Sequence, residues 1–377
     1  MATISYLTRI QFDFGALRLL PEELAGLGLR RPLIVTDRGI AACGILARVQ
    51  DALPPNVSAT LFDATPENPT EDAVLEALAL YREGDCDGLI GLGGGSSMDL
   101  AKAVRLLVTH DAPLAQYALI EGGAARIRSD LPPLVAVPTT AGTGSEVGRG
   151  AVIVLSDGRK LGLVSPHMIP SLALCDPELT LGLPPGLTAA TGLDAMAHCI
   201  ETFLSPAINP PADAIALDGL RRASRHIETA TREGGNRKAR WNMMMAAMEG
   251  AMAFQKGLGA VHAMSHPLGA LPGLKLHHGT LNAVVMPAVL RFNANHVGDK
   301  YTRLAEAMGL ASDVELVDAV MALNHRLGIP SGLREMGVEE DWLPALAKQA
   351  VGDHCNSTNP RPAKADDYVA LFRAAMG

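Results

Sequence analysis

The order of β-rich and helical segments changes once along this chain, and this change limits the folds that it can adopt. Through the first half, short apolar runs alternate with segments of helical periodicity, an order typical of a parallel sheet with helices on both faces. Six of these runs are predicted strands: 32–36, 57–62, 88–92, 134–137, 151–155 and 171–175. Beyond residues 180–186 the pattern is almost wholly helical and rich in Ala, Leu and Met. We therefore predict an α/β domain with a parallel sheet over residues 1–182 and an all-α helical domain over 183–377.

The overall composition excludes several classes of protein. A chain of 377 residues is long enough for two cores, and 48% apolar against 19% charged residues is an ordinary globular balance. A net charge of −8 and an aromatic content of 4% argue against nucleic-acid binding. The five cysteines include no CxxC pair, so neither a disulfide framework nor a zinc ribbon is expected. With no leader-like N-terminus and no apolar run of membrane-spanning length, we expect a cytoplasmic protein without membrane contact.

A glycine-rich run follows the third predicted strand and opens a helix. It reads GLGGGSSMDLAK, and its turn comprises Gly93, Gly94, Gly95, Ser96 and Ser97. Glycines let the backbone approach an anion closely, and the N-terminus of the following helix offers free N–H groups and a partial positive charge. The run lacks both the Lys-Ser/Thr ending of a P-loop and the GxGxxG spacing. A dinucleotide pyrophosphate is the expected ligand, and the alternative is a tight turn that binds nothing.

Two further polar features follow predicted strands. The segment PTTAGTGSE carries the hydroxyls of Thr139, Thr140, Thr143 and Ser145. These could bind phosphate or the nicotinamide amide, or they could simply satisfy the backbone of a turn. Asp37 ends the first strong strand, where an acid in dinucleotide folds binds the ribose 2′-OH and repels a 2′-phosphate. The alternative for Asp37 is a turn or helix-cap role.

Acidic and imidazole side chains repeat at helical spacing between residues 194 and 278. Asp194 and His198 are four apart in an otherwise apolar segment, so on a helix they share one face. The later histidines of this stretch are His262, His266, His277 and His278. One carboxylate and several imidazoles on facing helices is an arrangement by which helical bundles bind divalent metals. The alternative is a hydrogen-bonded Asp–His pair in the core.

Several long motifs, taken in order, resemble those of one enzyme family. They read GGGSSMDLAK, PTTAGTGSEV, DPELTLGLPP, GLDAMAHCIE, and HAMSHPLGA followed by HHGTLNAV. In this order they resemble the iron-containing (group III) alcohol dehydrogenases, and the resemblance runs from about residue 14 to residue 362. It implies a nucleotide-binding α/β domain, a helical domain, and an active site in the cleft between them.

The resemblance also implies roles for individual residues. The implied metal ligands are Asp194, His198, His262 and His278. His266 is implied to be a catalytic residue close to substrate and nicotinamide rather than a ligand. The segment before the last ligand is two residues longer than the family usually has, so His277 is an alternative to His278. The implied cofactor-binding positions are Asp37, Asn68, Gly93, Gly94, Gly95, Ser96, Ser97, Asp99, Thr139, Thr140, Thr143, Ser145 and Lys160.

The implied reaction is reversible hydride transfer between a primary alcohol, or its aldehyde, and NAD(H). The metal would act as a Lewis acid on the alcohol oxygen. Fe²⁺ is expected from the family, and Zn²⁺ is the alternative because these ligand types do not choose between the two ions. Gly150 stands where the family often has a larger side chain, which indicates a roomier site and a substrate larger than ethanol. The expected partners are this small alcohol or aldehyde and further copies of the chain, in a homodimer or larger assembly to which the β-like stretch 4–14 could contribute.

A second interpretation is a carbon–oxygen lyase similar to 3-dehydroquinate synthase, which shares the two-domain plan and uses both NAD and a metal. Such an enzyme needs several Lys and Arg side chains around a phosphorylated, carboxylated substrate. The ligand-bearing segments of this chain carry only Lys256 and Lys275. We therefore expect the dehydrogenase.

Overall fold

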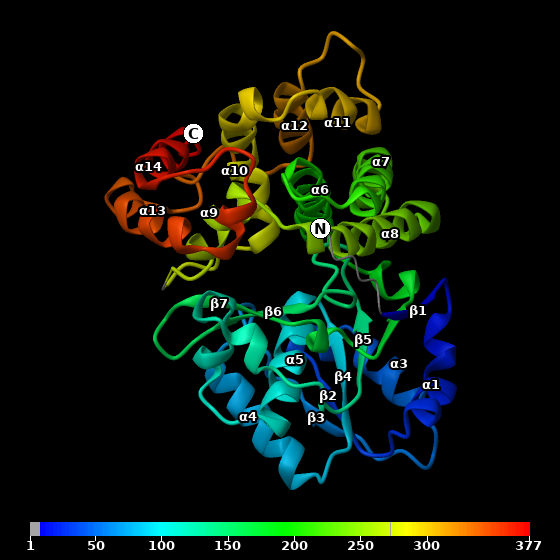
Figure 1. The fold of residues 1–377 in the computed structure, drawn as a ribbon. Coiled ribbons are helices and arrows are strands. Elements are labelled where there is room, and N and C mark those ends of the chain that lie inside the picture. The colour runs from blue at the N-terminus through cyan, green and yellow to red at the C-terminus, as the bar shows by residue number, and fades with distance from the viewer. Residues whose placement is uncertain (1–7, 272) are drawn as a thin grey trace. The chain divides into compact units, whose positions relative to one another are not determined.

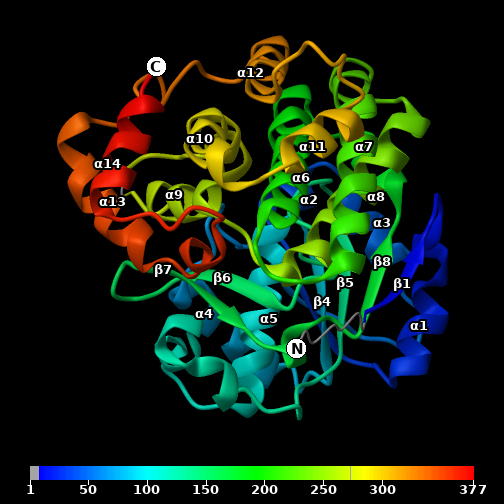
Figure 2. The ribbon, with the colours of Figure 1, turned by 45° about the horizontal axis from the view of Figure 1, so that its top comes forward.

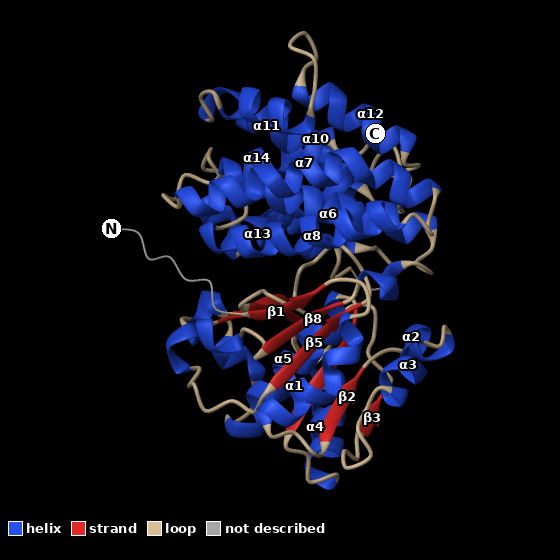
Figure 3. Cartoon of the chain, turned by 90° about the vertical axis from the view of Figure 1, so that its right-hand side faces the viewer, coloured by secondary structure: helices blue, strands red, loops and turns tan. Residues whose placement is uncertain are grey.

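The computed structural model describes residues 8–271 and 273–377, and the chain divides into two structural units. All strands of the described residues lie in one of these units. An α/β unit ends at Leu181 and a helical unit begins at Gly182, with residues 141–143 grouped with the helical unit. Figure 3 shows the strands confined to the first unit and the second built from helices and loops. The predicted fold class, a parallel α/β sheet followed by an all-α region, is confirmed.

Six parallel strands form the sheet of the α/β unit, in the order β1-β8-β5-β4-β2-β3. Figure 1 labels all of them except β8, which is labelled in Figure 3. Each neighbouring pair runs parallel. The strands are β1 (Arg9–Phe12), β2 (Pro32–Val35), β3 (Thr60–Phe62), β4 (Gly88–Gly93), β5 (Leu134–Pro138) and β8 (Leu172–Cys175). Because the strands are parallel, their carboxyl ends lie along one edge, where the loops that carry chemistry usually gather.

Two strand predictions need correction. The run 57–62 shortens to β3, because Val57 closes a turn by donating its N–H to the oxygen of Pro54 at 2.9 Å. The run 151–155 corresponds to β6 (Gly150–Val154), which pairs antiparallel with β7 (Lys160–Val164) outside the parallel sheet. The turn between them contains Asp157-Gly158, with Gly158 at a φ of 83°, which suits a tight hairpin. Within the stretch 4–14, β1 is an edge strand that pairs with β8 of the same chain, and residues 4–7 lie outside the described part; its contribution to an assembly stays a prediction.

Helices cover both faces of the sheet. They are α1 (Leu20–Leu27), α2 (Arg38–Ala42), α3 (Ile45–Asp51), α4 (Glu71–Glu83) and α5 (Gly95–Thr109). Alternate residues of one strand enter different cores: Leu33 and Val35 pack with α4 and α5, whereas Ile34 packs with α1 and α3. This follows from the two-residue period of a strand, which sends successive side chains to opposite faces.

The helical unit is arranged around α6 (Pro185–Leu204), whose residues are buried without a break from Thr188 to Leu204. Figure 2 shows α6 with α10 on one side and with α7 and α8 on the other, and these helices contact it directly. The others are α7 (Pro210–Arg232), α8 (Arg237–Ala253), α9 (Ala260–Leu268), α10 (His278–Asn293), α11 (Lys300–Met308), α12 (Leu316–Arg326), α13 (Leu343–Gly352) and α14 (Ala365–Ala374). A search of the described helices for one with the length and apolar character of a membrane span finds none.

A fully buried lysine holds the segment that follows β5. The Nζ of Lys102, on α5, donates to the Ser145 hydroxyl at 2.8 Å and to the carbonyls of Gly148 and Gly150 at 2.9 and 2.8 Å. Ser145 in turn donates to Asp99 at 2.6 Å. Burial lowers the pKa of Lys102 to about 8, against the opposing effect of Asp99. The ammonium group therefore ties one helix to the 145–150 segment at three points.

We predict that Lys102→Met lowers the free energy of unfolding by about 3–5 kcal/mol, because it leaves the Ser145 hydroxyl and two carbonyls without their donor and the nearby Asp99 without its counter-charge. Urea unfolding of the purified variant measures this loss. Lys348→Met is the control, because Lys348 is exposed and its replacement should change stability by less than about 0.5 kcal/mol. Equal effects of the two substitutions would contradict a structural role for Lys102.

Candidate functional site

Four side chains that the sequence marked as metal ligands converge inside the helical unit. Asp194 and His198 come from α6, His262 from α9, and His278 is the first residue of α10. The Asp194 Oδ1 lies 3.8, 3.9 and 3.7 Å from the Nε2 atoms of His198, His262 and His278. Three of these residues are buried, and the His278 side chain is 26% exposed. The cluster thus has one partly open side.

The close approach of α10 to α6 explains the Gly that follows the two adjacent histidines. A Cβ on Gly279 would overlap the backbone oxygen of Ala190, so only glycine allows α10 to begin this near to α6. That approach carries His278 to Asp194. His277 precedes the helix as its N-cap residue and is not part of the close group formed by Asp194, His262 and His278.

The donor set fits a divalent transition metal. The ligand atoms of Asp194, His262 and His278 lie within 4.8 Å of one another, and the oxygen–nitrogen separations near 3.8 Å are close to the roughly 3.4 Å found around a tetrahedral ion. Burial lowers the pKa of His198 to about 4, so its imidazole is neutral, as a metal ligand must be. A buried carboxylate facing neutral imidazoles is also costly unless a cation compensates it.

An asparagine that the sequence did not single out completes this cluster. Asn282 lies one helical turn after His278, and its Nδ2 donates to Asp194 Oδ1 at 2.7 Å. The same Nδ2 lies 3.2 Å from the Nε2 atoms of His262 and His278. The spacing of four residues was the available signal, because it places both side chains on one face of a helix.

A second missed residue, Glu201, contacts one of the histidines. Its Oε2 lies 2.6 Å from His262 Nδ1, while its Oε1 accepts the backbone N–H of Val261 at 2.7 Å. Glu201 follows His198 by three residues on the buried face of α6 and is only 4% exposed. A charged residue on an otherwise apolar helical face was the signal that could have identified it.

His266 has a carboxylate partner of its own. Its Nδ1 lies 2.8 Å from Asp353 Oδ2, and the ring of His354 stacks at a centroid distance of 5.9 Å. Burial alone would raise the pKa of Asp353, but His266 and His354 outweigh it and hold that pKa well below its usual range. Burial also raises the pKa of the neighbouring Cys355 thiol well above its usual range, so this thiol is a poor metal ligand. The pairing of the His266 imidazole with a carboxylate is an arrangement that can handle protons.

The predicted nucleotide turn lies at the carboxyl edge of the parallel sheet. The N–H of Thr139, after β5, donates to the oxygen of Gly93, the last residue of β4, at 3.0 Å, and Thr140 lies beside Gly94. Gly93 has a φ of 142°, a conformation that favours glycine. The buried hydroxyls of Ser97 and Thr139 have no hydrogen-bond partner in the described part of the chain. Buried unsatisfied hydroxyls beside a glycine turn fit a polar ligand such as a pyrophosphate.

The other predicted cofactor residues divide into groups. Asp37 caps α2 by accepting the Ile40 N–H at 3.0 Å through Oδ1. The Nζ of Lys160 donates to Asn68 at 2.7 Å, and Ser96 donates to the oxygen of Glu67. Gly95 is the first residue of α5, whereas Asp99 and Ser145 belong to the Lys102 network described above. Thr143 is grouped with the helical unit.

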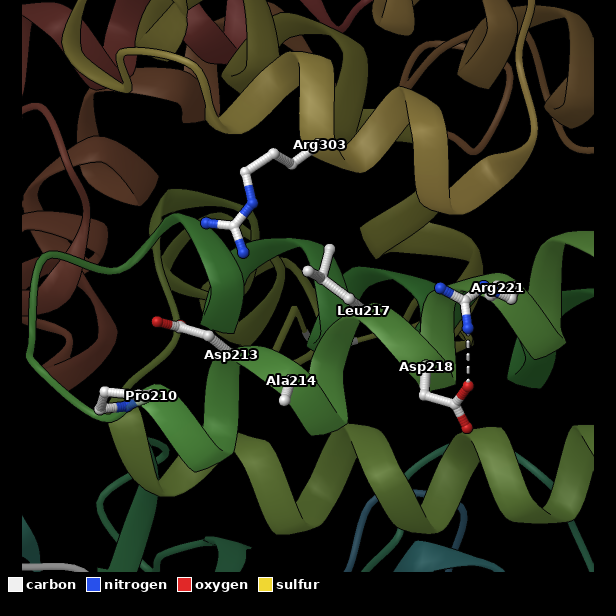
Figure 4. Close-up of a pocket in the computed structure, with 7 residues that line it drawn as sticks. All are labelled: Pro210, Asp213, Ala214, Leu217, Asp218, Arg221 and Arg303. Atoms are coloured by element: carbon white, nitrogen blue, oxygen red, sulfur yellow. Dashed lines mark hydrogen bonds and ion pairs between the residues drawn. The ribbon is translucent and has the colours of Figure 1, made fainter.

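A pocket elsewhere on the helical unit has no such chemistry. Figure 4 shows it along α7, with Asp213 and Asp218 on one wall and Arg303 of α11 opposite. Asp218 is paired with Arg221 at 3.2 Å, and Asp213 accepts from the buried Lys256. Because these charges already have partners in the chain, the histidine cluster is the better candidate for a reaction site.

Comparison with known proteins identifies the family. The chain matches the model of iron-containing alcohol dehydrogenases over residues 8–177, and the model of the C-terminal part of the Fe-containing alcohol dehydrogenase family over residues 188–376. This protein therefore belongs to the iron-containing alcohol dehydrogenase family, and it is an oxidoreductase that interconverts alcohols and aldehydes.

Three relatives illustrate the range of the family. A 4-hydroxybutyrate dehydrogenase of Cupriavidus necator is 58% identical, with 100% of both chains covered. A 1,3-propanediol oxidoreductase of known crystal structure is 35% identical in sequence, with a TM-score of 0.90 and 100% of both chains covered. A sulfoacetaldehyde reductase of Bifidobacterium kashiwanohense, solved with NAD⁺, is 28% identical, with a TM-score of 0.89 and with 100% of this chain and 98% of that one covered. These relatives favour the dehydrogenase over the lyase.

The geometry makes a sharp distinction between the two adjacent histidines. We predict that His278→Ala abolishes tight binding of a divalent metal, whereas His277→Ala retains it, because His278 and not His277 belongs to the close group with Asp194 and His262. Metal content after gel filtration, together with titration by Co²⁺ followed through its visible absorption, measures both. The reverse result would assign the ligand to His277.

Proposed function

We propose that this enzyme interconverts 4-hydroxybutyrate and the corresponding aldehyde acid, with NAD as the hydride carrier and one Fe²⁺ in the histidine cluster. The substrate is proposed from the 58% identity, over the full length of both chains, to a 4-hydroxybutyrate dehydrogenase. The relatives named for propanediol and lactaldehyde are 35–37% identical. A primary alcohol with a terminal carboxylate is therefore the best-supported substrate.

The metal would be held by Asp194, His198, His262 and His278. Bound there, it would supply Lewis-acid polarisation of the substrate oxygen, and NAD would supply the hydride acceptor. Iron is proposed over zinc only because the family is described as iron-containing, since one carboxylate and three imidazoles suit Zn²⁺ equally well. The partly exposed edge of His278 gives small molecules a route to the cluster.

His266 is proposed to handle the proton that alcohol oxidation releases. Its Nδ1 faces the ionised Asp353 at 2.8 Å, so that nitrogen carries the hydrogen. Nε2 is then the atom that can accept a proton. The His266 ring stacks on that of His278 at a centroid distance of 5.6 Å, and this proximity to the cluster supports the proposal. Asp353 would stabilise the protonated imidazole during transfer.

NAD rather than NADP is proposed from Asp37. This carboxylate lies at the carboxyl end of β2, and its Oδ2 is near Gly93 of the nucleotide turn. An acid in this position can accept the ribose 2′-OH and repels a 2′-phosphate. The helix-cap role of Oδ1 is compatible with this function because the other oxygen stays available.

The substrate proposal predicts a preference for the carboxylate. The specificity constant kcat/KM for 4-hydroxybutyrate should exceed that for butan-1-ol by about 10- to 100-fold, the range expected for a charged hydrogen-bonded contact. Initial rates of NADH formation with Fe²⁺-loaded enzyme measure both. Butane-1,4-diol is the matched control, because it has the same chain length and no charge. Equal values for the three alcohols would contradict a carboxylate-binding site.

The cofactor proposal predicts that Asp37→Ser raises the NADP-to-NAD ratio of kcat/KM by about 10-fold or more, because a like-charge contact is removed. Serine is also a good N-cap, so α2 keeps its cap and the variant tests charge alone. Unchanged thermal unfolding would verify that the cap is retained. An unchanged cofactor ratio in such a stable variant would remove Asp37 from the ribose site.

A further inference from the structure

The N-terminus of α9 is capped by two side chains from distant parts of the chain. Its N-cap residue, Gly259, has no side chain, and a Cβ there would crowd both Glu201 and Asn359. Asn359 Oδ1 accepts the N–H of Ala260 at 3.1 Å. Glu201 accepts the N–H of Val261 at 2.7 Å and that of His262 at 3.3 Å. The first orphan N–H groups of the helix are thus satisfied from outside it.

Only one of the two capping side chains also contacts an imidazole. The same Oε2 of Glu201 that accepts the His262 backbone N–H lies 2.6 Å from His262 Nδ1. A carboxylate surrounded by N–H donors and the positive end of a helix acts as an acceptor alone. When the His262 ring is neutral, as a metal ligand must be, its hydrogen therefore resides on Nδ1, which leaves the lone pair on Nε2. That Nε2 is the atom directed at Asp194, 3.9 Å from its Oδ1.

We propose that Glu201 is a positioning residue of the metal centre, which fixes the tautomer and the ring orientation of His262 so that Nε2 is free to bind the ion. This assignment rests on the proposed function, because it requires His262 to be a ligand. A carboxylate that accepts the second N–H of a ligating histidine raises the basicity of the ligand, and loss of such a partner typically costs 10- to 100-fold in metal affinity.

Glutamine at this position creates a conflict that glutamate does not have. Glu201 presents an acceptor oxygen to Val261 and another to His262, whereas Gln has one oxygen and one NH₂ group. If the oxygen keeps the Val261 N–H, the NH₂ faces His262 Nδ1 and favours the tautomer with hydrogen on Nε2. If the oxygen turns to His262, two N–H groups face each other at Val261. One of the two functions of Glu201 is therefore lost without any change in side-chain size.

The experiment compares Glu201→Gln with Asn359→Ala in the full-length enzyme. Both variants weaken the N-terminus of α9, but Asn359 makes no contact with an imidazole. Titration of each metal-free protein with Co²⁺ and with Zn²⁺ gives the dissociation constant, and circular dichroism reports the folded fraction. We expect Glu201→Gln to weaken binding of both ions by about 10- to 100-fold. Asn359→Ala should lower the thermal midpoint while its dissociation constant stays within about threefold of the wild type.

Three results would overturn the assignment. Wild-type affinity in folded Glu201→Gln would make Glu201 a helix cap alone. Equal loss of affinity in Asn359→Ala would attribute the effect to the helix end rather than to the imidazole. A wild-type protein that binds neither ion would remove the proposed metal centre itself, and the assignment of Glu201 with it.

A measurement on the unmodified enzyme covers the case in which Glu201→Gln does not fold. Long-range ¹H–¹⁵N correlation spectra of zinc-loaded, ¹⁵N-histidine-labelled protein distinguish the two tautomers of each ring. A resonance set absent from His262→Ala identifies the ring. Hydrogen on Nδ1 of His262 supports the assignment, and hydrogen on its Nε2 contradicts it.

Discussion

Burial of negative charge is the constraint on which the helical unit depends. Asp194, Glu201 and Asp353 are all withdrawn from solvent, and an isolated buried carboxylate is too costly to persist. Each has a different partner: Asp194 accepts from the Asn282 amide, Glu201 accepts from N–H groups of α9, and Asp353 is paired with His266. Because every one of these contacts joins two helices, satisfying the charges and assembling the histidine cluster are the same event. The two carboxylates also contact different histidines of α9: Glu201 contacts His262, and Asp353 contacts His266.

The α/β unit depends on a different constraint, the geometry of parallel strands. Neighbouring strands β2, β4 and β5 end along one edge, and the residues that follow them are Asp37, the glycine turn and Thr139. No long-range side-chain contact is needed to bring these loops together, because strand order alone does so. The Lys102 network then fixes the segment beyond β5, with Asp99 and Ser145 held against one another. Asp99 and Ser145 belong to motifs expected to bind the cofactor, yet their contacts in the structure hold the backbone around those motifs.

The periodicity of apolar residues along the sequence was sufficient to predict most strands and helices and part of the candidate site. Alternating apolar runs predicted the parallel sheet, and the four-residue spacing of Asp194 and His198 placed both on one helical face. The hairpin of β6 and β7 was missed although its Asp157-Gly158 turn is a recognised signal, because a single apolar run does not reveal its pairing direction. The partner of β1 is some 160 residues away, beyond the reach of any periodicity. Glu201 could have been noticed as a charge on the buried face of α6, but its partner could not, and neither could that of Asp353, because the contacts with His262 and His266 are tertiary.

The three anchors of Lys102 have a consequence for ligand binding. A loop that is disordered before its ligand arrives must lose conformational entropy on binding, and this loss weakens the observed affinity. Here the carbonyls of Gly148 and Gly150 and the hydroxyl of Ser145 are already held by one ammonium group inside the folded unit. The conformational entropy of this segment is therefore lost once, when the protein folds, and not again at each binding event. For the cofactor site proposed above, such rigidity would let modest contacts suffice for recognition, because little conformational entropy remains to be lost on binding.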